Sequence, residues 1–147
     1  MPAANFKYLP NVADVAFVAH GETFKEVLEN SGAAILNLMF DMKELKKDKS
    51  KVKTLRISDS APNRNELTWF ILQKIVSKVD EKGVQAFRFK VNRITESKGR
   101  IKVNGCIFYK KSRTYLSLLD VKAVTPHELE VKGSAGKKWT IKAILDV

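Results

Sequence analysis

The sequence predicts an α+β fold in which two helices pack on a mainly antiparallel, mixed β-sheet. Three observations predict it: strand-like apolar runs come before the first helical pattern, one strand separates the two helical patterns, and the second half alternates with period two. The chain has 147 residues, of which 44% are hydrophobic and 29% charged, enough for a full core without disulfides. We therefore expect residues 1–147 to form a single domain.

The first third of the chain predicts strands followed by a helix. Residues 6–19 are densely apolar and partly β-branched, which predicts one or two strands interrupted near Pro10. Thr23 and Glu26 have the spacing of a capping box, and the helix they begin is expected to run to about Phe40. Its apolar positions recur every three or four residues: Phe24, Val27, Leu28, Ala34, Ile35, Leu38 and Met39.

A strand and a second helix are expected next. The lysine-rich segment 41–53 predicts an exposed connection, and residues 51–57 predict a strand. Residues 58–63 then offer candidate N-caps and a proline near a helix start, and the helix is expected to end before Gly83. Its apolar stripe is wide enough to be covered on more than one side: Leu67, Trp69, Phe70, Ile71, Leu72, Ile75, Val76 and Val79.

From Val84 onward the pattern is that of antiparallel strands. Apolar Phe87, Phe89 and Val91 alternate with polar residues, residues 96–99 predict a turn, and residues 101–107 predict the returning strand. Three further strands are expected at 115–124, 128–132 and 139–145, with residues 133–136 as the last hairpin connection.

The charge of the chain points to an anionic partner. There are 27 Lys and Arg residues against 16 Asp and Glu, a formal net charge of +11, which favours nucleic acid or an acidic protein surface. Most of the cations are lysines, which suits a diffuse electrostatic footprint rather than bidentate base reading. Solvated lysines that serve solubility explain the composition equally well. The sequence leaves both interpretations open.

Several functional classes have no support in the sequence. No apolar run approaches the roughly twenty residues of a membrane span, and the start lacks a signal peptide, so a soluble, cytoplasmic protein is expected. Cys106 is the single cysteine and should be a buried small hydrophobe. His20 and His127 have no ligand cluster beside them, and the phosphate-loop, zinc and nucleophile signatures are missing. The chain is expected not to be an enzyme.

Aromatic residues on the predicted strands have two interpretations. Phe87, Phe89, Phe108 and Tyr109 lie in basic strands and could stack on RNA bases. The first two, however, share a face with Val91 while cationic residues point the other way, which favours a core face backed by a solvated face. Trp69 and Trp139 are expected to be core anchors whose indole N–H reaches a partner.

Three charged residues are embedded in apolar runs and suggest a site. Asp14 follows Val12-Ala13, Asp146 follows Ile144-Leu145, and Lys122 lies in the run 119–124. Burying an unpaired charge is costly, so each is expected to have a partner. If the two ends of the chain meet, the three residues form one site. The alternative is a buried salt bridge that merely holds the sheet together.

Taken together, these segments resemble the archease family. The resemblance rests on Ala13-Asp14-Val15, the helix entry 21–27, the segment 120–125 with His127, and Trp139 with the closing residues 144–147. It spans nearly the whole chain in the right order. It implies a non-enzymatic protein cofactor that activates the GTP-dependent RNA ligase RtcB in tRNA splicing and promotes its guanylylation and turnover.

The resemblance also implies roles for particular residues. Asp14 and Asp146 are the acidic pair of a divalent-metal site, and Lys122 is the essential basic residue. Calcium takes roughly six to eight oxygens, so the terminal carboxylate of Val147, backbone carbonyls and water are expected to complete the shell. Asn11 and the pair Gln73-Lys74 depart from the family pattern. A lysine near two carboxylates would replace part of the metal's charge, so we expect the metal to bind weakly or not at all.

Two other functions are compatible with the sequence. One is a basic RNA-binding module, or a chaperone that modulates a tRNA-modifying enzyme such as a tRNA cytosine methyltransferase, with which archeases have been linked. In that case tRNA affinity would fall steeply with salt and be shared among many lysines. The other is a small metal-dependent hydrolase that uses the two aspartates and needs no partner protein.

Overall fold

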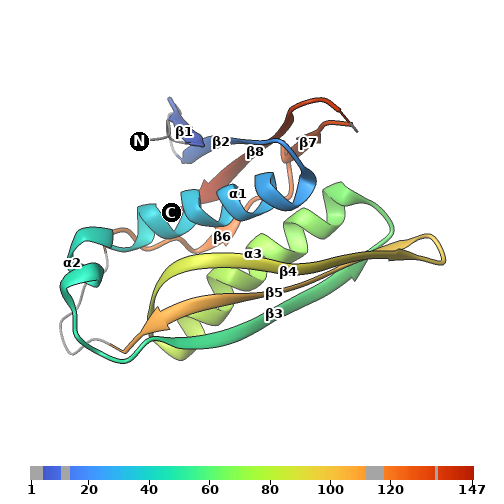
Figure 1. The fold of residues 1–147 in the computed structure, drawn as a ribbon. Helices are drawn as coiled ribbons and strands as arrows, with labels where there is room; N and C mark the ends of the chain where they lie inside the picture. Colours follow the sequence, from blue (N-terminus) through green and yellow to red (C-terminus); the bar gives the residue numbers. More distant parts are fainter. Residues whose placement is uncertain (1–4, 11–13, 112–117, 135) are drawn as a thin grey trace.

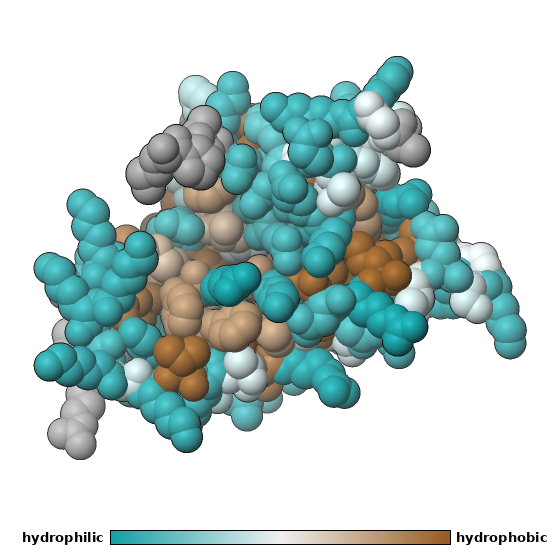
Figure 2. All heavy atoms as spheres, viewed as in Figure 1, coloured by the Kyte–Doolittle hydropathy of each residue, from teal (hydrophilic) through white to brown (hydrophobic). Residues whose placement is uncertain are grey.

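The computed structural model describes residues 5–10, 14–111, 118–134 and 136–147. The elements follow the chain in this order: β1 (Phe6–Leu9), β2 (Val15–Gly21), α1 (Phe24–Met39), α2 (Met42–Lys47), β3 (Lys53–Ala61), α3 (Arg64–Lys82), β4 (Gln85–Ser97), β5 (Arg100–Lys110), β6 (Ala123–Val124), β7 (Glu130–Lys132) and β8 (Trp139–Asp146). Figure 1 shows three layers, with α1 and α3 lying between an upper and a lower sheet. On the face drawn in Figure 2, hydrophobic side chains gather along the middle, and hydrophilic ones cover the ends.

The α+β class is confirmed, but the strands form two sheets rather than one. One sheet has the order β1-β2-β8-β6, with β7 also paired to β8, and the other has the order β3-β5-β4. Every pairing among the described strands is antiparallel. The reason is the wide apolar surface of α3, where Ile71, Leu72 and Val76 are all buried. A helix with buried residues around so much of its circumference needs a layer on each side.

The helix ends follow the predicted capping chemistry. Thr23 Oγ1 accepts a hydrogen bond of 3.1 Å from the backbone N–H of Glu26, and Glu26 Oε1 accepts one from Glu22 at 3.3 Å. Asn63 caps α3, and Gly83 ends it with a left-handed φ of 64°. Glycine adopts that conformation without steric cost, which explains why the helix ends there.

Close contacts between α1 and β4 fix the helix on the lower sheet. A Cβ atom added to Gly32 would lie 2.7 Å from Cδ2 of Phe89, so only glycine permits this approach. Nearby, Glu29 Oε2 accepts a hydrogen bond of 2.9 Å from the backbone N–H of Val91, beside a β-bulge. Neither α1 nor any other helix in the described ranges is long and apolar enough to cross a membrane.

The segment 41–53, predicted to be an exposed connection, contains the short helix α2. Asp41 caps it by accepting hydrogen bonds from the backbone N–H groups of Lys43 and Glu44, and Leu45 is fully buried. One apolar residue among lysines gives too weak a periodic signal to predict a helix. The structure shows that Leu45 nevertheless docks α2 on the core.

Other boundaries also differ from the prediction. β3 continues to Ala61, past the expected end at Ile57, because its polar residues lie in a sheet whose other face is buried. Of the strand expected at 115–124, residues 115–117 lie outside the described residues, and the rest is strand only over β6. Short edge strands of this kind have little periodic signal in the sequence.

Candidate functional site

The strand register brings the two ends of the chain together at β8. Val15 of β2 pairs with Leu145, so Asp14, which precedes Val15, and Asp146, which follows Leu145, lie at neighbouring positions. On the other edge of β8, Asp146 pairs with Ala123, and its carbonyl oxygen accepts a hydrogen bond of 2.8 Å from the backbone N–H of Lys122. The structure thus places all three predicted residues around one end of β8.

Exposure of these side chains contradicts the buried salt bridge. Lys122 and Asp146 are exposed and Asp14 is half-buried. In the part of the chain that the structure describes, none of the three belongs to an ion pair. The apolar neighbours misled the sequence argument because a strand alternates its faces, so a charge between two core residues still points to solvent. The three groups are available to a partner.

The donor chemistry of the acidic pair fits a weakly held divalent cation. Carboxylate oxygens are the ligands that Ca²⁺ and Mg²⁺ prefer. Over the described ranges there is no group of three or more His, Cys, Asp or Glu residues that could hold a metal ion, so Asp14 and Asp146 could supply only part of a shell. The half-buried side chain of Val147 packs against the core beside Asp146. Metal binding by these residues stays a prediction.

A row of polar side chains on α3 holds the segment that carries Lys122. Asn65 donates from Nδ2 to the carbonyl of Leu129 at 3.0 Å and accepts from the N–H of Val131 at 3.0 Å. Two turns further along, Gln73 donates from Nε2 to Ser77 Oγ at 3.1 Å. Residues four apart on a helix lie on one face, so this row tracks the neighbouring segment along the length of the helix.

Val124 is the residue held most completely by this row. Its N–H donates to Gln73 Oε1 at 2.8 Å, and its carbonyl accepts from Trp69 Nε1 at 2.7 Å. Because β6 has only two residues, the ladder with β8 alone gives it little support. The contacts to Gln73 and Trp69 therefore position Lys122, two residues earlier. The predicted partner for the Trp69 indole N–H is confirmed.

An acid-rich groove lies beside Lys122. It has a volume of about 320 Å³ and runs between the last turns of α3 and the segment 120–122. Its lining residues are Val76, Ser77, Asp80, Glu81, Asp120, Val121 and Lys122. Three carboxylates and one ammonium group line it, so the charge of its lining is opposite in sign to that of the whole chain. Such a surface favours a cationic group of a partner over a bare polyanion.

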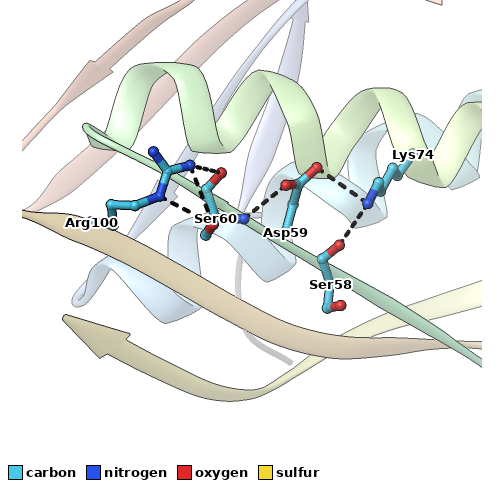
Figure 3. A network of polar contacts seen from close by, with 5 residues as sticks. All are labelled: Ser58, Asp59, Ser60, Lys74 and Arg100. Atoms are coloured by element: carbon cyan, nitrogen blue, oxygen red, sulfur yellow. Dashed lines mark hydrogen bonds and ion pairs between the residues drawn. The ribbon is translucent and has the colours of Figure 1, made fainter. Parts of the chain in front are cut away.

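Lys74, one of the departures from the family pattern, is engaged elsewhere. Its Nζ lies 3.2 Å from Asp59 Oδ2 and donates to the carbonyl of Ser58 at 2.7 Å, both on β3. Figure 3 shows this contact beside that of Arg100, which donates to the carbonyl of Ser60 at 3.1 Å. Lys74 thus ties α3 to the lower sheet. Its ammonium group is accounted for without the acidic pair.

The two histidines lie apart from the acidic pair. The Nδ1 atom of His20 is buried and has no hydrogen-bond partner among the residues that the structure describes. Desolvation lowers the pKa of His20 below its usual 6.5, and the positive charges of Lys138 and Lys7 lower it further. His127 is exposed. Neither belongs to a group in the described chain that could hold a metal.

Asn65 was not among the predicted site residues, and Gln73 was predicted only as a departure from the family pattern. The available signal was the spacing of Asn65, Trp69 and Gln73 at intervals of four, which puts three side-chain N–H donors on one helix face. Nothing in the sequence says which strand that face meets.

Comparisons with known proteins agree with this architecture. The family model described as the archease protein family (MTH1598/TM1083) matches residues 6–147. The protein archease of Methanosarcina mazei is 28% identical over 148 residues, which cover 97% of this chain and 95% of that protein. The protein archease of Methanosarcina acetivorans is 27% identical with the same coverage of both chains.

Solved structures show the same fold. The solution structure of Methanobacterium thermoautotrophicum protein 1598 superposes with a TM-score of 0.83 at 24% identity, covering 99% of this chain and 100% of that one. The crystal structure of an archease from Thermotoga maritima, described as a possible chaperone, has a TM-score of 0.50 at 20% identity, with 96% of each chain covered. With the family model matched over nearly its whole length, this chain belongs to the archease family.

Proposed function

We propose that this archease is a non-enzymatic activator of the GTP-dependent RNA ligase RtcB in tRNA splicing, promoting its guanylylation and turnover. The observation that carries the proposal is the convergence of Asp14, Lys122 and Asp146 at one end of β8, with the last two exposed. Family membership supplies the expected partner. A description of the Thermotoga maritima relative as a possible chaperone also fits a protein that acts on another protein.

The site acts by presenting charge to the ligase. The Lys122 ammonium group is a compact cation on a flexible stem, suited to reach a phosphate of bound nucleotide or an acidic side chain of the ligase. Asp14 and Asp146 would hold a divalent cation, which when bound would supply positive charge for a phosphate group. No bond is made or broken by this chain itself.

The position of Lys122 is set from two sides. Its backbone N–H is bonded to Asp146 of β8, and Val124 is bonded to Gln73 and Trp69 of α3. A side chain on a segment held in this way loses less conformational freedom when it meets its partner, which favours binding. The acid-rich groove beside it gives the ligase a second, electrostatic point of contact.

Guanylylation of the ligase tests the proposal directly. The cognate RtcB is incubated with labelled GTP and a divalent metal, with the archease present in catalytic amounts, and formation of the ligase–guanylate adduct is followed. Wild-type archease should raise the yield and turnover, whereas Asp14→Asn, Lys122→Met and Asp146→Asn should not. Failure of the wild-type protein to stimulate the ligase would refute the proposal.

Matched variants separate function from folding. Lys142→Met and Glu130→Gln remove an exposed lysine and an exposed carboxylate from the same sheet and should leave stimulation intact. Exposed substitutions usually change stability by less than about 0.5 kcal/mol, so Lys122→Met and Asp146→Asn should melt like the wild type. Loss of stimulation with loss of the fold would mean that the residues serve the structure instead.

A further inference from the structure

Along most of the lower sheet the outward face is open to solvent among the described residues, whereas at one end the outward residues Gln85 and Lys110 are buried. The face of β3-β5-β4 that packs on the helices carries the buried residues Ile57, Phe89 and Val103. Side chains directly opposite in a ladder share a face, so the register assigns the remaining alternate positions to the other face. Figure 1 shows this sheet as the outermost layer of the molecule on its side.

Besides Arg100, whose guanidinium donates to Ser60, five exposed cations occupy this outward face, which we call the basic face. They are Arg56 on β3, Arg88, Lys90 and Arg93 on β4, and Lys102 on β5. All five are exposed. No outward position in the described register of this sheet carries a carboxylate, and none of the five cations is in an ion pair with a described residue.

The arrangement concentrates like charge in one place. Arg56 and Lys90 both pair with Cys106 from opposite edges of β5, so they flank it on the same face. Cys106 is half-buried there, which corrects the expectation that it would be a buried hydrophobe. Their charges add on one side of the sheet, and no described outward position carries a carboxylate to offset them. An unrelieved set of five therefore points to an anionic partner rather than to folding.

An aromatic ring lies within this face. Phe108 pairs with Arg88 and is half-buried, and the Arg88 guanidinium carbon lies 5.3 Å from its ring centroid. Single-stranded nucleic acids are bound by basic surfaces on which bases stack on aromatic rings and guanidinium planes. Phe108 and Arg88 supply both kinds of stacking surface.

We propose that the basic face binds single-stranded RNA through its phosphates, with Phe108 and Arg88 as the stacking surface. Residues two apart on a strand are about 6.5 Å apart, so the cations form spaced rows that can follow an extended backbone. A membrane is a poorer match, because the rings at this face, Phe108 and the neighbouring Phe87, are half-buried and form no apolar wedge for insertion. An acidic protein would need the cations but not the half-buried Phe108 ring.

This surface is separate from the end of β8. The basic face lies on the lower sheet, whereas Asp14, Lys122 and Asp146 belong to the upper sheet, with the helices between the two sheets. One molecule can therefore contact the ligase with its acid-rich side and RNA with its basic face. RNA binding does not depend on the proposed activation, since it is measured on the isolated protein.

Fluorescence anisotropy with a labelled oligouridylate of roughly fifteen nucleotides tests the inference, at about 50 and 200 mM salt. The test variant is Arg56→Gln/Lys90→Gln/Arg93→Gln. The matched control, Lys137→Gln/Lys138→Gln/Lys142→Gln, removes the same charge from exposed positions by the upper sheet. The test variant should bind about tenfold more weakly. In a plot of the logarithm of the binding constant against the logarithm of the salt concentration, its slope should be less steep by about 2. The control should bind like the wild type.

Three results would overturn the inference. The first is equal weakening of both variants, which would mean a diffuse charge effect. The second is equally tight binding to polyglutamate or to phosphatidylserine vesicles, which would mean any polyanion or a membrane. The third is unchanged oligouridylate affinity in Phe108→Leu, which would exclude stacking. Guanylylation of the ligase consumes no RNA, so the test variant should still stimulate it, and each proposal can fail without the other.

Discussion

The side-chain oxygen Oε1 of Gln73 lies 2.8 Å from the backbone nitrogen of Val124 and accepts its hydrogen bond. Val124 is buried, so without this contact its N–H would be left without a partner in the core. Its carbonyl is bonded to Trp69, one helical turn before Gln73. A residue that departs from the family pattern thus supports the segment on which Lys122 lies.

Replacing Gln73 by alanine should loosen that segment. The Val124 N–H would be buried and unsatisfied, which costs about 1–3 kcal/mol of unfolding free energy. Urea unfolding measures the loss, and hydrogen exchange of residues 120–125 should accelerate. Ser77→Ala removes only the other partner of Gln73 and should cost little. Gln73→Glu keeps the acceptor and should behave more like the wild type than Gln73→Ala; equal losses in both would argue against the hydrogen bond as the cause.

Lys110→Met should release α2 from the lower sheet. The Lys110 ammonium group is buried and donates to the carbonyls of Leu45 at 2.6 Å and Asp48 at 2.8 Å, at the end of α2. Hydrogen bonds from a charged group contribute about 1.5–3 kcal/mol, and methionine keeps the apolar stem. Unfolding free energy should fall by that amount, and hydrogen exchange in residues 42–47 should rise. Lys111→Met, at the exposed neighbouring lysine, should change neither.

Stability should fall as the pH is lowered from about 7 to about 5, partly because of His20. Burial of its ring lowers its pKa in the folded protein below the usual 6.5, and Lys138 and Lys7 add to the effect. The folded state therefore favours neutral His20. The stability that neutral His20 contributes to the folded state is fully present above the pKa of His20 in the unfolded chain. It is lost as the pH falls through the pKa of His20 in the folded protein. Unfolding free energies across this range should depend less steeply on pH in His20→Gln. His127→Gln serves as the control, and a slope reduced only in that variant would contradict the assignment to His20.

Much of the fold could be predicted because its signals are local. Thr23, Asn63 and Gly83 set the helix ends through contacts within a few residues, and the alternation around Phe89 gives the buried face of β4. The short elements α2 and β6 could not be predicted in this way. Each rests on a few long-range contacts, such as Lys110 to Leu45 and Gln73 to Val124, which leave no periodic pattern.

The sequence by itself determined the α+β class, the two long helices with their caps, the excess of positive charge and the resemblance that singles out Asp14, Lys122 and Asp146. The tertiary structure decided where these features lie. Pairing of β8 with β2 and β6 brings residues from both ends of the chain together, and division of the strands into two sheets gathers five cations on one open face. Sequence patterns report which face of an element is buried, whereas the choice of neighbouring strands depends on contacts between distant residues, and those contacts create both surfaces.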